Sequence, residues 1–346
     1  MHKTWILLGL LTVAGATAHA ADVKPLVVKV IVVTTFEVGA DTGDQPGEFQ
    51  YWAEREKWYR KVMVPGMVHP VYVSDKGELA VVSGATARCA EQIMALAVDP
   101  RFDFTHAYWM LAGIAGANPS VASVASASWA KYIIDGDIAY EIDSRETPQE
   151  WPYGVIPIGS KKPNELPHYV GWAPTEMAFP LNPALVARAY SVTKDVALMD
   201  TPELASFRAA YQGFPNALKP PFVLVGDVVG SNRYWHGAIM AHWAEDWTKI
   251  WTNGKGRFTM TAMEDHGYAA ALTELDAMGK VDFQRVLDLR AASNYCMPAP
   301  GETAADSLEA GFVSYIPAVE TDYRVGSVMV HDILAHWDDV YAAGVK

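Results

Sequence analysis

The amino-acid sequence predicts an α/β fold built in layers, and three observations lead to it. Residues 27–33 are mostly β-branched, as in a buried strand, and a polar loop at 34–39 follows them. Strand and helix patterns then alternate along the chain, which is the order typical of α/β proteins. The chain has 346 residues, of which 51% are hydrophobic, and this is enough to bury a large core. Because open α/β sheets bind ligands beyond the carboxyl ends of their strands, the loops there are candidate sites.

The later elements follow from local composition: β-branched or alternating segments predict strands, and longer segments of helix-forming residues predict helices. The predicted strands are 71–73, 79–83, 105–111, 222–229 and 284–292. The predicted helices are 85–96, 237–251, 262–278 and 328–343. A glycine-containing turn at 113–116 is expected after the strand at 105–111, and the small residues between 121 and 134 imply close packing.

We expect residues 21–346 to form one domain with a proline-rich insertion at about 144–180. Seven prolines fall in that segment, with aromatic residues between them. A loop of this length in a compact domain either has a function, as a lid or an interface arm, or wraps the surface, and both interpretations stay open.

The charge balance excludes one class of partner. Lysine and arginine number 27 and aspartate and glutamate 40, so the net charge at pH 7 is −13. A protein this acidic repels phosphate backbones, and we therefore expect no nucleic-acid partner.

The first twenty residues are typical of a secretory signal. Lys3 supplies the positive region, residues 5–15 the apolar region, and residues 18–20 a small-x-small cleavage site before Ala21. We therefore expect a signal peptide at 1–20 and a periplasmic or secreted protein. The apolar stretch is shorter than the roughly 20 residues that span a bilayer, and no other segment comes closer, so we expect no integral membrane span in the mature chain.

Two cysteines, Cys89 and Cys296, lie far apart in the sequence. In an oxidising compartment, one long-range disulfide and two buried free thiols fit this spacing equally well.

Several familiar catalytic motifs are absent from the sequence. It contains no P-loop, no glycine-rich dinucleotide fingerprint and no Gly-x-Ser-x-Gly elbow. His331, Asp332 and His336 have a spacing that could hold a metal ion, but a C-terminal helix favours solvated or capping roles for them. We therefore expect no metal and no cofactor.

Two carboxylates open the predicted helix at 262–278. Glu264 and Asp265 would stabilise its N-terminus through the helix dipole, and this is the simpler interpretation. Glu264 would also suit the two hydroxyls of a vicinal diol, with the Met263 thioether against the apolar face of a sugar. The motif alone does not choose between the two.

Two other strand ends carry groups that suit a purine. The strand at 284–292 leads to Asn294, whose amide can hydrogen-bond two adjacent atoms of a heterocycle. The strand at 222–229 leads to Ser231, Asn232 and Tyr234, which place hydroxyl and amide groups beside a ring that can stack. An ordinary surface loop explains this second cluster equally well.

Taken in order, these segments resemble the purine nucleoside permease family. The resemblance is carried by residues 30–39, 112–119, 263–265 and 292–294, and it extends over nearly the whole mature chain. The family is in turn similar to the nucleoside phosphorylase and nucleosidase superfamily. The resemblance implies a three-layer α/β/α sandwich around a mixed, partly closed central sheet, assembled as a homo-oligomer. It also implies that a purine nucleoside or purine base is the ligand.

The resemblance assigns substrate-binding roles residue by residue. Glu264 accepts hydrogen bonds from the ribose hydroxyls and Met263 packs against the sugar. Tyr234, with Ser231 and Asn232 near it, falls where the superfamily stacks on the base.

It also assigns two catalytic roles. Asn294 takes the place of the Asp or Asn that contacts purine N7 and stabilises the departing base, and relatives in the family resemble this strand end with Asp. Glu37 falls about two residues from where nucleosidases carry a water-positioning carboxylate, and a surface carboxylate is the other interpretation. Gly39 and Gly113, in the two glycine-containing segments of the resemblance, are expected beside the substrate.

Leu111 and Ile114 stand where phosphorylases have Arg and Ser to grip phosphate, so phosphate is disfavoured as a co-substrate. We therefore expect purine nucleoside recognition with N-glycosidic cleavage, as in a nucleosidase or phosphorylase. A non-catalytic nucleoside-binding protein that supports transmembrane transport is the alternative.

Overall fold

The structure is a computed structural model that describes residues 24–84, 89–173 and 177–346. The predicted signal peptide and the first four residues of the predicted helix at 85–96 lie outside these ranges.

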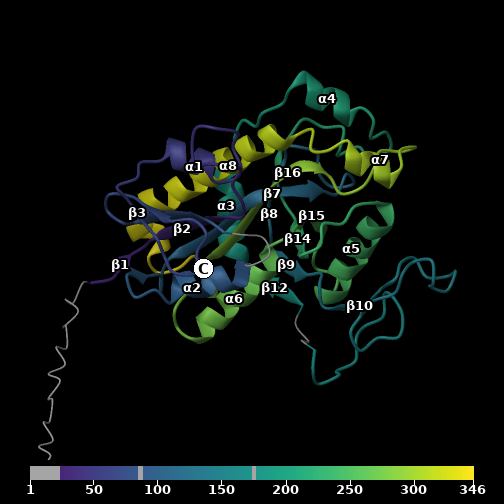
Figure 1. Ribbon diagram of the computed structural model, residues 1–346, viewed down its shortest axis with the longest axis horizontal. Helices are drawn as coiled ribbons and strands as arrows, with labels where there is room; N and C mark the ends of the chain where they lie inside the picture. Colours follow the sequence, from purple (N-terminus) through teal and green to yellow (C-terminus); the bar gives the residue numbers. More distant parts are fainter. Residues whose placement is uncertain (1–23, 85–88, 174–176) are drawn as a thin grey trace, which may run out of the picture.

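Short and long strands alternate with helices throughout the described chain (Figure 1). The strands are β1 (Leu26–Val27), β2 (Val30–Thr34), β3 (Arg60–Val62), β4 (Val71–Val73), β5 (Leu79–Ser83), β6 (Phe102–Asp103), β7 (Tyr108–Ala117), β8 (Ala127–Trp129), β9 (Tyr132–Asp135), β10 (Ala139–Glu141), β11 (Val155–Pro157), β12 (Ala178–Pro180), β13 (Val223–Val225), β14 (Asp227–Gly230), β15 (Phe258–Ala262) and β16 (Val286–Tyr295). The helices are α1 (Gln50–Arg55), α2 (Cys89–Ala97), α3 (Pro183–Thr193), α4 (Pro202–Arg208), α5 (Ala238–Trp251), α6 (Asp265–Ala277), α7 (Ala304–Glu309) and α8 (Tyr315–Ala335), with a 3₁₀ turn η2 (Phe283–Arg285) and a π-helical turn η3 (Trp337–Tyr341).

In the described part of the chain, twelve strands form one mixed sheet. Its main path runs β12-β9-β14-β15-β7-β2-β5-β4-β3, and it branches at β7. There β16 runs parallel to β7 along almost its whole length and then pairs antiparallel with β8, which carries β13. β7 therefore has hydrogen-bonded neighbours on both paths, and the central sheet is mixed, as expected.

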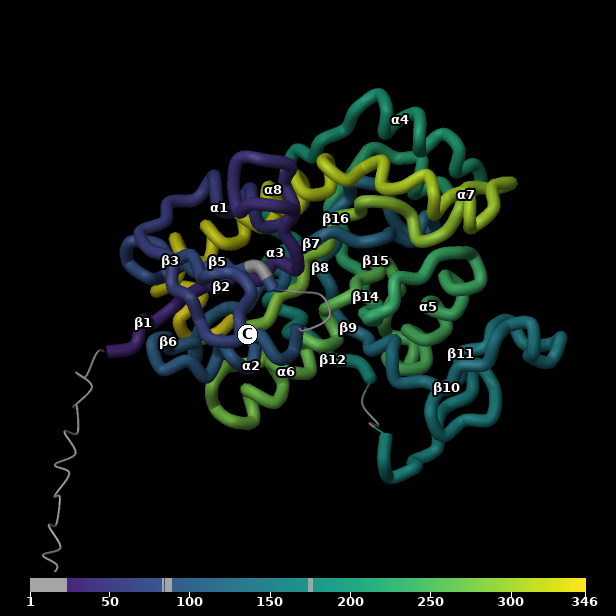
Figure 2. The backbone as a smooth tube through the Cα atoms, in the orientation of Figure 1, coloured from purple at the N-terminus to yellow at the C-terminus, as the bar shows by residue number. Residues whose placement is uncertain are grey.

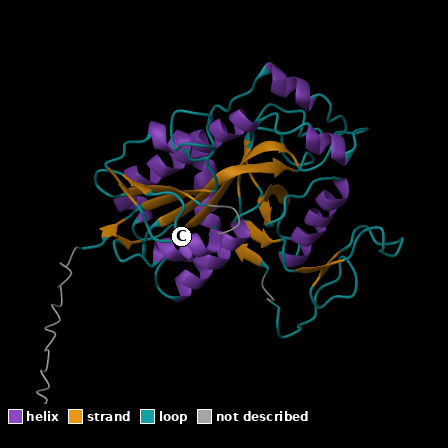
Figure 3. Cartoon of the chain, in the orientation of Figure 1, coloured by secondary structure: helices purple, strands orange, loops and turns teal. Residues whose placement is uncertain are grey.

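Helices cover the two faces of this sheet and complete three layers (Figures 1 and 3). On one face α8 packs on β16 and β7, with α1 and α3 beside it. On the other face α2 and α6 pack together, and α6 also contacts β14 and β9. The predicted three-layer α/β/α architecture is therefore confirmed.

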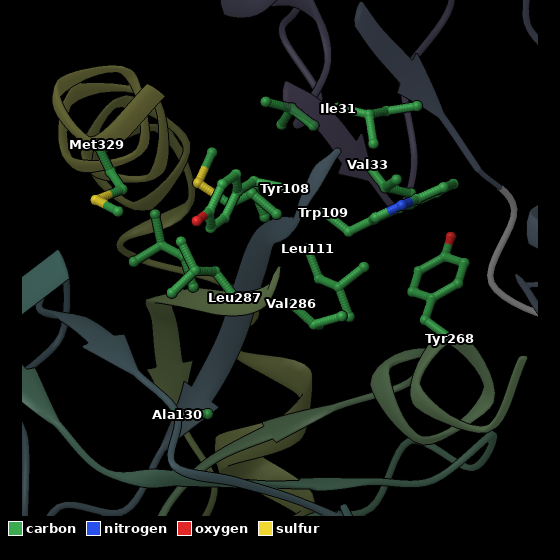
Figure 4. Close-up of a cluster of buried hydrophobic side chains, with 14 of the residues drawn as sticks. Ile31, Val33, Tyr108, Trp109, Leu111, Ala130, Tyr268, Val286, Leu287 and Met329 are labelled. Atoms are coloured by element: carbon green, nitrogen blue, oxygen red, sulfur yellow. The ribbon is translucent and has the colours of Figure 1, made fainter. Parts of the chain in front are cut away.

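The core lies where β2, β7 and β16 meet. Figure 4 shows Ile31, Val33, Trp109 and Leu111 together with Val286, all of which are fully buried. Burying these side chains stabilises the centre of the sheet, whose carboxyl ends then carry the loops of the site.

The central strands extend further than composition predicted. The expected turn at 113–116 is part of β7, and β16 continues to Tyr295, because the two strands pair from Trp109↔Val286 to Ala117↔Tyr295, with one register shift near the end. The last helix begins at Tyr315, well before residue 328. In each case long-range pairing or packing decides the boundary, and local composition does not reveal it.

The proline-rich insertion leaves the body of the molecule beside α5 (Figure 2). There β10 and β11 form a two-stranded hairpin apart from the main sheet, and β12 returns to pair with β9. Both cysteines are buried and free, so the structure favours the two-thiol interpretation. Within the described ranges, no helix has the length and apolar character that a membrane span requires.

Candidate functional site

A pocket of about 550 Å³ lies beyond the carboxyl ends of β2, β14, β15 and β16, beside the last residues of β7. Its apolar and aromatic lining consists of Phe36, Val38, Ile114, Ala115, Tyr234, Trp235, Ala262, Met263, Phe312 and Tyr315. Its polar lining consists of Thr35, Gln45, Glu48, Arg233, Thr261, Glu264, Ser293 and Asn294, with Gly116 at its floor. A largely apolar cavity with a few convergent polar groups is typical of a small-molecule site.

Four of the predicted site residues line this pocket. Asn294 and Tyr234 lie together, since the Asn294 Nδ2 donates to the Tyr234 hydroxyl at 3.0 Å. Glu264 and Met263 follow β15, so the predicted sugar-binding and base-binding groups share one cavity.

Asn294 owes its position to an irregularity in β16. The register shifts between Ala292 and Asn294, so that Ser293 is an extra residue, and both Ser293 and Asn294 reach the pocket. The Asn294 Nδ2 also donates to the Tyr295 carbonyl at 2.9 Å, and Ser293 Oγ lies 3.1 Å from Asn294 Oδ1. These contacts fix the amide orientation, and Oδ1, which has two lone pairs, keeps one of them for a ligand besides the contact with Ser293.

Glu264 occupies the N-terminal boundary of α6, but its side chain makes no capping hydrogen bond to the helix. Instead the Arg290 guanidinium lies beneath it, with Nη2 donating to Glu264 Oε2 at 3.3 Å. Arg290 also binds Asp265 through two hydrogen bonds, of 2.9 and 2.7 Å. Both carboxylates lie at the N-terminus of α6, as the dipole interpretation requires, and the buried arginine also binds both of them.

Glu48, which sequence reasoning did not single out, is the other carboxylate in the pocket. Its Oε2 accepts from the Thr35 N–H at 2.7 Å and the Thr35 hydroxyl at 2.5 Å, and its Oε1 accepts from the Ile114 N–H at 2.6 Å. Arg290 Nη1 lies 3.8 Å from Oε1. A carboxylate has about four acceptor positions, so one remains for a molecule in the pocket.

Burial raises the pKa of Glu48 to about 7, and the nearby Glu264 adds to the rise while Arg290 opposes it. Glu48 therefore changes its protonation state near neutral pH. A general base works best with a pKa close to the working pH, so this group is suited to accept a proton from water.

Glu37 lies outside the pocket lining, with a structural role. Its carboxylate accepts four backbone hydrogen bonds, from Val38, Gly47, Phe49 and Gln50. These bonds fold the loop at 38–47 back onto the end of β2, and the loop thereby delivers Glu48. Burial raises the pKa of Glu37, and the four N–H groups oppose that rise.

Two other predicted residues form a network beside the pocket. The Ser231 hydroxyl donates to Asp137 at 2.6 Å, and the Asn232 side chain donates to the same carboxylate at 2.6 Å. His266 Nε2 lies 3.1 Å from Asp137. Ser231 and Asn232 thus hold the end of β14 against the turn between β9 and β10, and both are absent from the pocket lining.

The two predicted glycines lie where neighbouring side chains leave no room for a Cβ atom. Gly39 has a φ of +72° in a turn where Ala40 N–H donates to Asp44, and an added Cβ would lie 2.3 Å from that carboxylate. Gly113 lies in β7, where a Cβ would lie 2.3 Å from Arg290 and 2.5 Å from Glu48. Gly113 therefore permits the approach of Arg290 to Glu48, and neither glycine lines the pocket.

Leu111 and Ile114 do not flank a turn, because both belong to β7. Leu111 is fully buried in the core, whereas Ile114 lines the pocket. Within the described residues, no group of three histidine, cysteine, aspartate or glutamate side chains is close enough to hold a metal ion.

No sequence signal marked Glu48, because the short helix α1 that begins two residues after it was not predicted. Sequence reasoning gave Arg290 no role either, because no local sequence pattern indicates that an arginine in a strand will contact carboxylates from two other elements.

Comparison with known proteins agrees with this geometry. The family model described as purine nucleoside permease (NUP) matches residues 27–346. This chain belongs to the purine nucleoside permease family.

Two fungal members of the purine nucleoside permease family are similar to this chain over most of its length. A probable purine nucleoside permease of Schizosaccharomyces pombe is 31% identical over 258 residues, which are 72% of this chain and 74% of the relative. A purine nucleoside permease of Candida albicans is 27% identical over 350 residues, which are 95% of this chain and 81% of the relative.

Solved structures show the fold of this permease-family chain. A 5′-methylthioadenosine/S-adenosylhomocysteine nucleosidase from Streptococcus pneumoniae superposes with a TM-score of 0.51 at 14% identity, covering 87% of this chain and 98% of the other. The futalosine hydrolase of Helicobacter pylori has a TM-score of 0.52 at 12% identity, covering 88% and 97%. The fold is therefore nucleoside phosphorylase-like, as predicted.

Proposed function

We propose that this protein recognises purine nucleosides outside the cytoplasm and hydrolyses their N-glycosidic bond. The observation that carries the proposal is the pocket itself, in which Glu48, Glu264 and Asn294 surround one cavity of nucleoside size. Each of the three has a chemistry suited to one part of the substrate: the attacking water, the ribose and the purine.

Glu264 suits the ribose. Its carboxylate, held by Arg290, can accept hydrogen bonds from two vicinal hydroxyls, and Met263 next to it offers an apolar surface to the sugar ring. These contacts would hold C1′ between the base end of the pocket and Glu48.

Asn294 and Tyr234 suit the purine. The Tyr234 ring, half exposed at the pocket, can lie against the flat base, while Asn294 Oδ1 accepts from an N–H on its edge. As the glycosidic bond breaks, its electron pair moves onto the purine. The purine takes up a proton from solvent at N7, where the N–H donates to Asn294 Oδ1, and Glu48 later returns its own proton to solvent.

Glu48 suits the water. In its ionised form it would take one proton as the water oxygen bonds to C1′ and the bond from C1′ to N9 breaks. The products are ribose and the free base. Because Glu48 has a pKa of about 7, kcat/KM should rise with pH through this region as the carboxylate ionises.

The same carboxylate supports hydrolysis over phosphorolysis. Thr35 and Ile114 donate three hydrogen bonds to Glu48, and Arg290 lies 3.8 Å from it. A phosphate would need such donors, and they are already engaged by a negative side chain that would repel it. Phosphate is therefore disfavoured as a co-substrate, and the proposed hydrolysis needs only water beside the nucleoside.

The extracytoplasmic location is supported by the signal-like sequence at residues 1–20. The single domain at 21–346 and assembly as a homo-oligomer stay predictions. The structural neighbours are named as a nucleosidase and a hydrolase, which favours hydrolysis as the reaction class.

The test is to incubate the protein with inosine or adenosine, with and without phosphate, and to separate the products by chromatography. We expect free base and ribose at a rate independent of phosphate. Ribose 1-phosphate formed in proportion to added phosphate would contradict the hydrolytic reaction.

One observation favours a second candidate, a non-catalytic binding protein that supports nucleoside transport. The Asn294 amide has no acidic proton to give to a departing base, unlike a protonated carboxyl group. Binding of nucleosides in calorimetry, with no free base released from any of them, would identify this function.

Substitution of Glu264 by Gln should weaken nucleoside binding far more than binding of the free base. The change removes a charged acceptor for two hydroxyls, which is worth roughly 1.5–3 kcal/mol. Calorimetry with inosine and hypoxanthine makes the comparison, and the base serves as the internal control. Equal losses for the two ligands would place Glu264 away from the sugar.

Substitution of Asn294 by Asp should shift the preference toward adenosine. An ionised carboxylate in place of the amide would face the Tyr295 carbonyl, so the new carboxyl group should be protonated in the free protein. With adenosine bound, its single O–H would donate to N7 in place of that carbonyl, and its other oxygen would accept from the 6-amino group. We expect a swing of about 1–3 kcal/mol in the inosine-to-adenosine ratio of affinities or of kcat/KM. Asn253→Asp, on the exposed surface, is the control. An unchanged ratio would remove Asn294 from the base site.

A further inference from the structure

Large apolar side chains gather on one short segment of the proline-rich insertion. Leu166, Tyr169 and Trp172 keep 66%, 79% and 68% of their surface exposed. Among the described residues, only Tyr59, at 75%, joins them above 65%. Three of the four most exposed large apolar side chains therefore lie within seven residues of each other.

This segment, residues 160–172, which we call the arm tip, is anchored by polar contacts at its base. Ser160 Oγ donates to the Glu165 carbonyl at 3.0 Å, and the Lys161 N–H donates to the Glu165 carboxylate at 2.7 Å. Asn164 Nδ2 donates at 2.5 Å to Asp246, a buried carboxylate on α5. The arm tip is thus tied to the body, while its apolar side chains stay on the outside.

The charge of the arm tip differs in sign from that of the whole chain. Lys161 and Lys162 outnumber Glu165, so the arm tip carries +1, whereas the chain carries −13. Both lysines are exposed, as is His168. Figure 2 shows that the insertion projects from the body beside α5, so the two lysines belong to a segment that extends from the main fold.

We propose that the arm tip docks the protein on a lipid surface with anionic headgroups. Tryptophan and tyrosine place an apolar ring and a polar edge at the level of the headgroups, which is where both residues concentrate in membrane proteins. Two adjacent lysines attract anionic lipids, and this attraction offsets the repulsion of an acidic protein body. A projecting, aromatic and basic segment fits a flat anionic surface better than a concave protein site. This inference stands apart from the catalytic proposal.

The test is co-sedimentation of the full chain with phosphatidylcholine vesicles, prepared with and without phosphatidylglycerol. All variants carry the same N-terminal segment, so that its contribution cancels. The arm variants are Y169S/W172S and K161Q/K162Q, and Y59S is the control because Tyr59 is equally exposed outside the insertion. Thermal unfolding of each variant confirms that it is folded.

We expect the wild-type chain and Y59S to bind phosphatidylglycerol vesicles equally. K161Q/K162Q should bind these vesicles roughly 30-fold more weakly, from the loss of two lysine charges near the surface. Y169S/W172S should bind at least about ten-fold more weakly to both kinds of vesicle. Binding unaffected by either arm variant, or lost equally in Y59S, would overturn the proposal. Absence of vesicle binding by the wild-type chain would also overturn it. A protein would then be the remaining kind of partner for the arm tip.

Discussion

Substitution of Glu48 by alanine is expected to lower the rate of inosine hydrolysis by about 10²–10⁴-fold, the usual contribution of a positioned general base. The wild-type kcat/KM should rise with pH through about 7, where Glu48 ionises, and the variant should lack this rise. Steady-state kinetics between pH 5 and pH 9 (about the range the fold should tolerate) measure both effects.

The same variant should acquire an effect of phosphate. Removing the Glu48 carboxylate leaves the Thr35 and Ile114 donors unpaired beside Arg290, and these are groups that bind a small anion. We expect added phosphate to accelerate cleavage by the variant and to yield ribose 1-phosphate, whereas the wild-type rate does not change. Glu150→Ala, an exposed glutamate on the insertion, is the matched control and should behave as wild type. A Glu48→Ala variant as active as this control would remove Glu48 from the reaction.

Sequence alone indicated part of the pocket lining, although β15 itself was not predicted as a strand. Asn294 lies at the end of β16 and Tyr234 follows β14, and both strands overlap predicted ones, so that local patterns place these two residues at the carboxyl edge of the sheet. Glu264 and Met263 were indicated by the start of the predicted helix at 262–278 and by the family resemblance.

The position of Glu48, the proposed general base, could not be predicted in this way, because it depends on a fold-back of the chain. Glu37 is nearer in sequence to the end of β2, yet its carboxylate is taken up by the backbone of residues 47–50. This contact brings Glu48, eleven residues later, to Thr35 at the end of the strand. Sequence reasoning singled out Glu37 from this loop, whereas the hydrogen bonds of the loop place Glu48 at the pocket instead.

Long-range pairing also explains why the phosphate argument needed correction. The comparison of Leu111 and Ile114 assumed a turn, but parallel pairing with β16 continues β7 to Ala117. Leu111 is consequently a core residue, and the groups around Glu48 are what bear on phosphate. The expectation that phosphate is disfavoured therefore rests on a different residue from the one that first suggested it.

A second large effect, on the stability of the fold, is expected from the buried charged side chains beneath the pocket. Arg290 is almost completely buried and faces four carboxylates, those of Glu48, Glu264, Asp265 and Asp288. Burial and the neighbouring Asp265 raise the pKa of Asp288 well above its ordinary value, so this group holds a proton. Arg290 is then the cation that compensates the remaining carboxylates, and its own pKa is raised because their attraction outweighs the effect of burial.

Substitution of Arg290 by methionine should therefore destabilise the protein by about 3–5 kcal/mol at neutral pH, the usual cost of leaving a buried charge without its partner. Without the guanidinium, the pKa values of the carboxylates in the folded state rise above their unfolded values near 4. The folded state then binds more protons than the unfolded state, so the free energy of unfolding falls as pH increases above about 4. The loss should consequently be smaller at about pH 5 than at about pH 8.

Urea denaturation of the wild type and the Arg290→Met variant at these two pH values measures the difference. Arg208→Met is the matched control, because Arg208 is also buried but pairs with one partly exposed carboxylate, that of Asp200. We expect the control to be destabilised with much less dependence on pH, since Asp200 can remain hydrated and ionised once its partner is gone. An equal loss at both pH values in Arg290→Met would mean that these carboxylates do not depend on the arginine charge, and that the residue acts through packing instead.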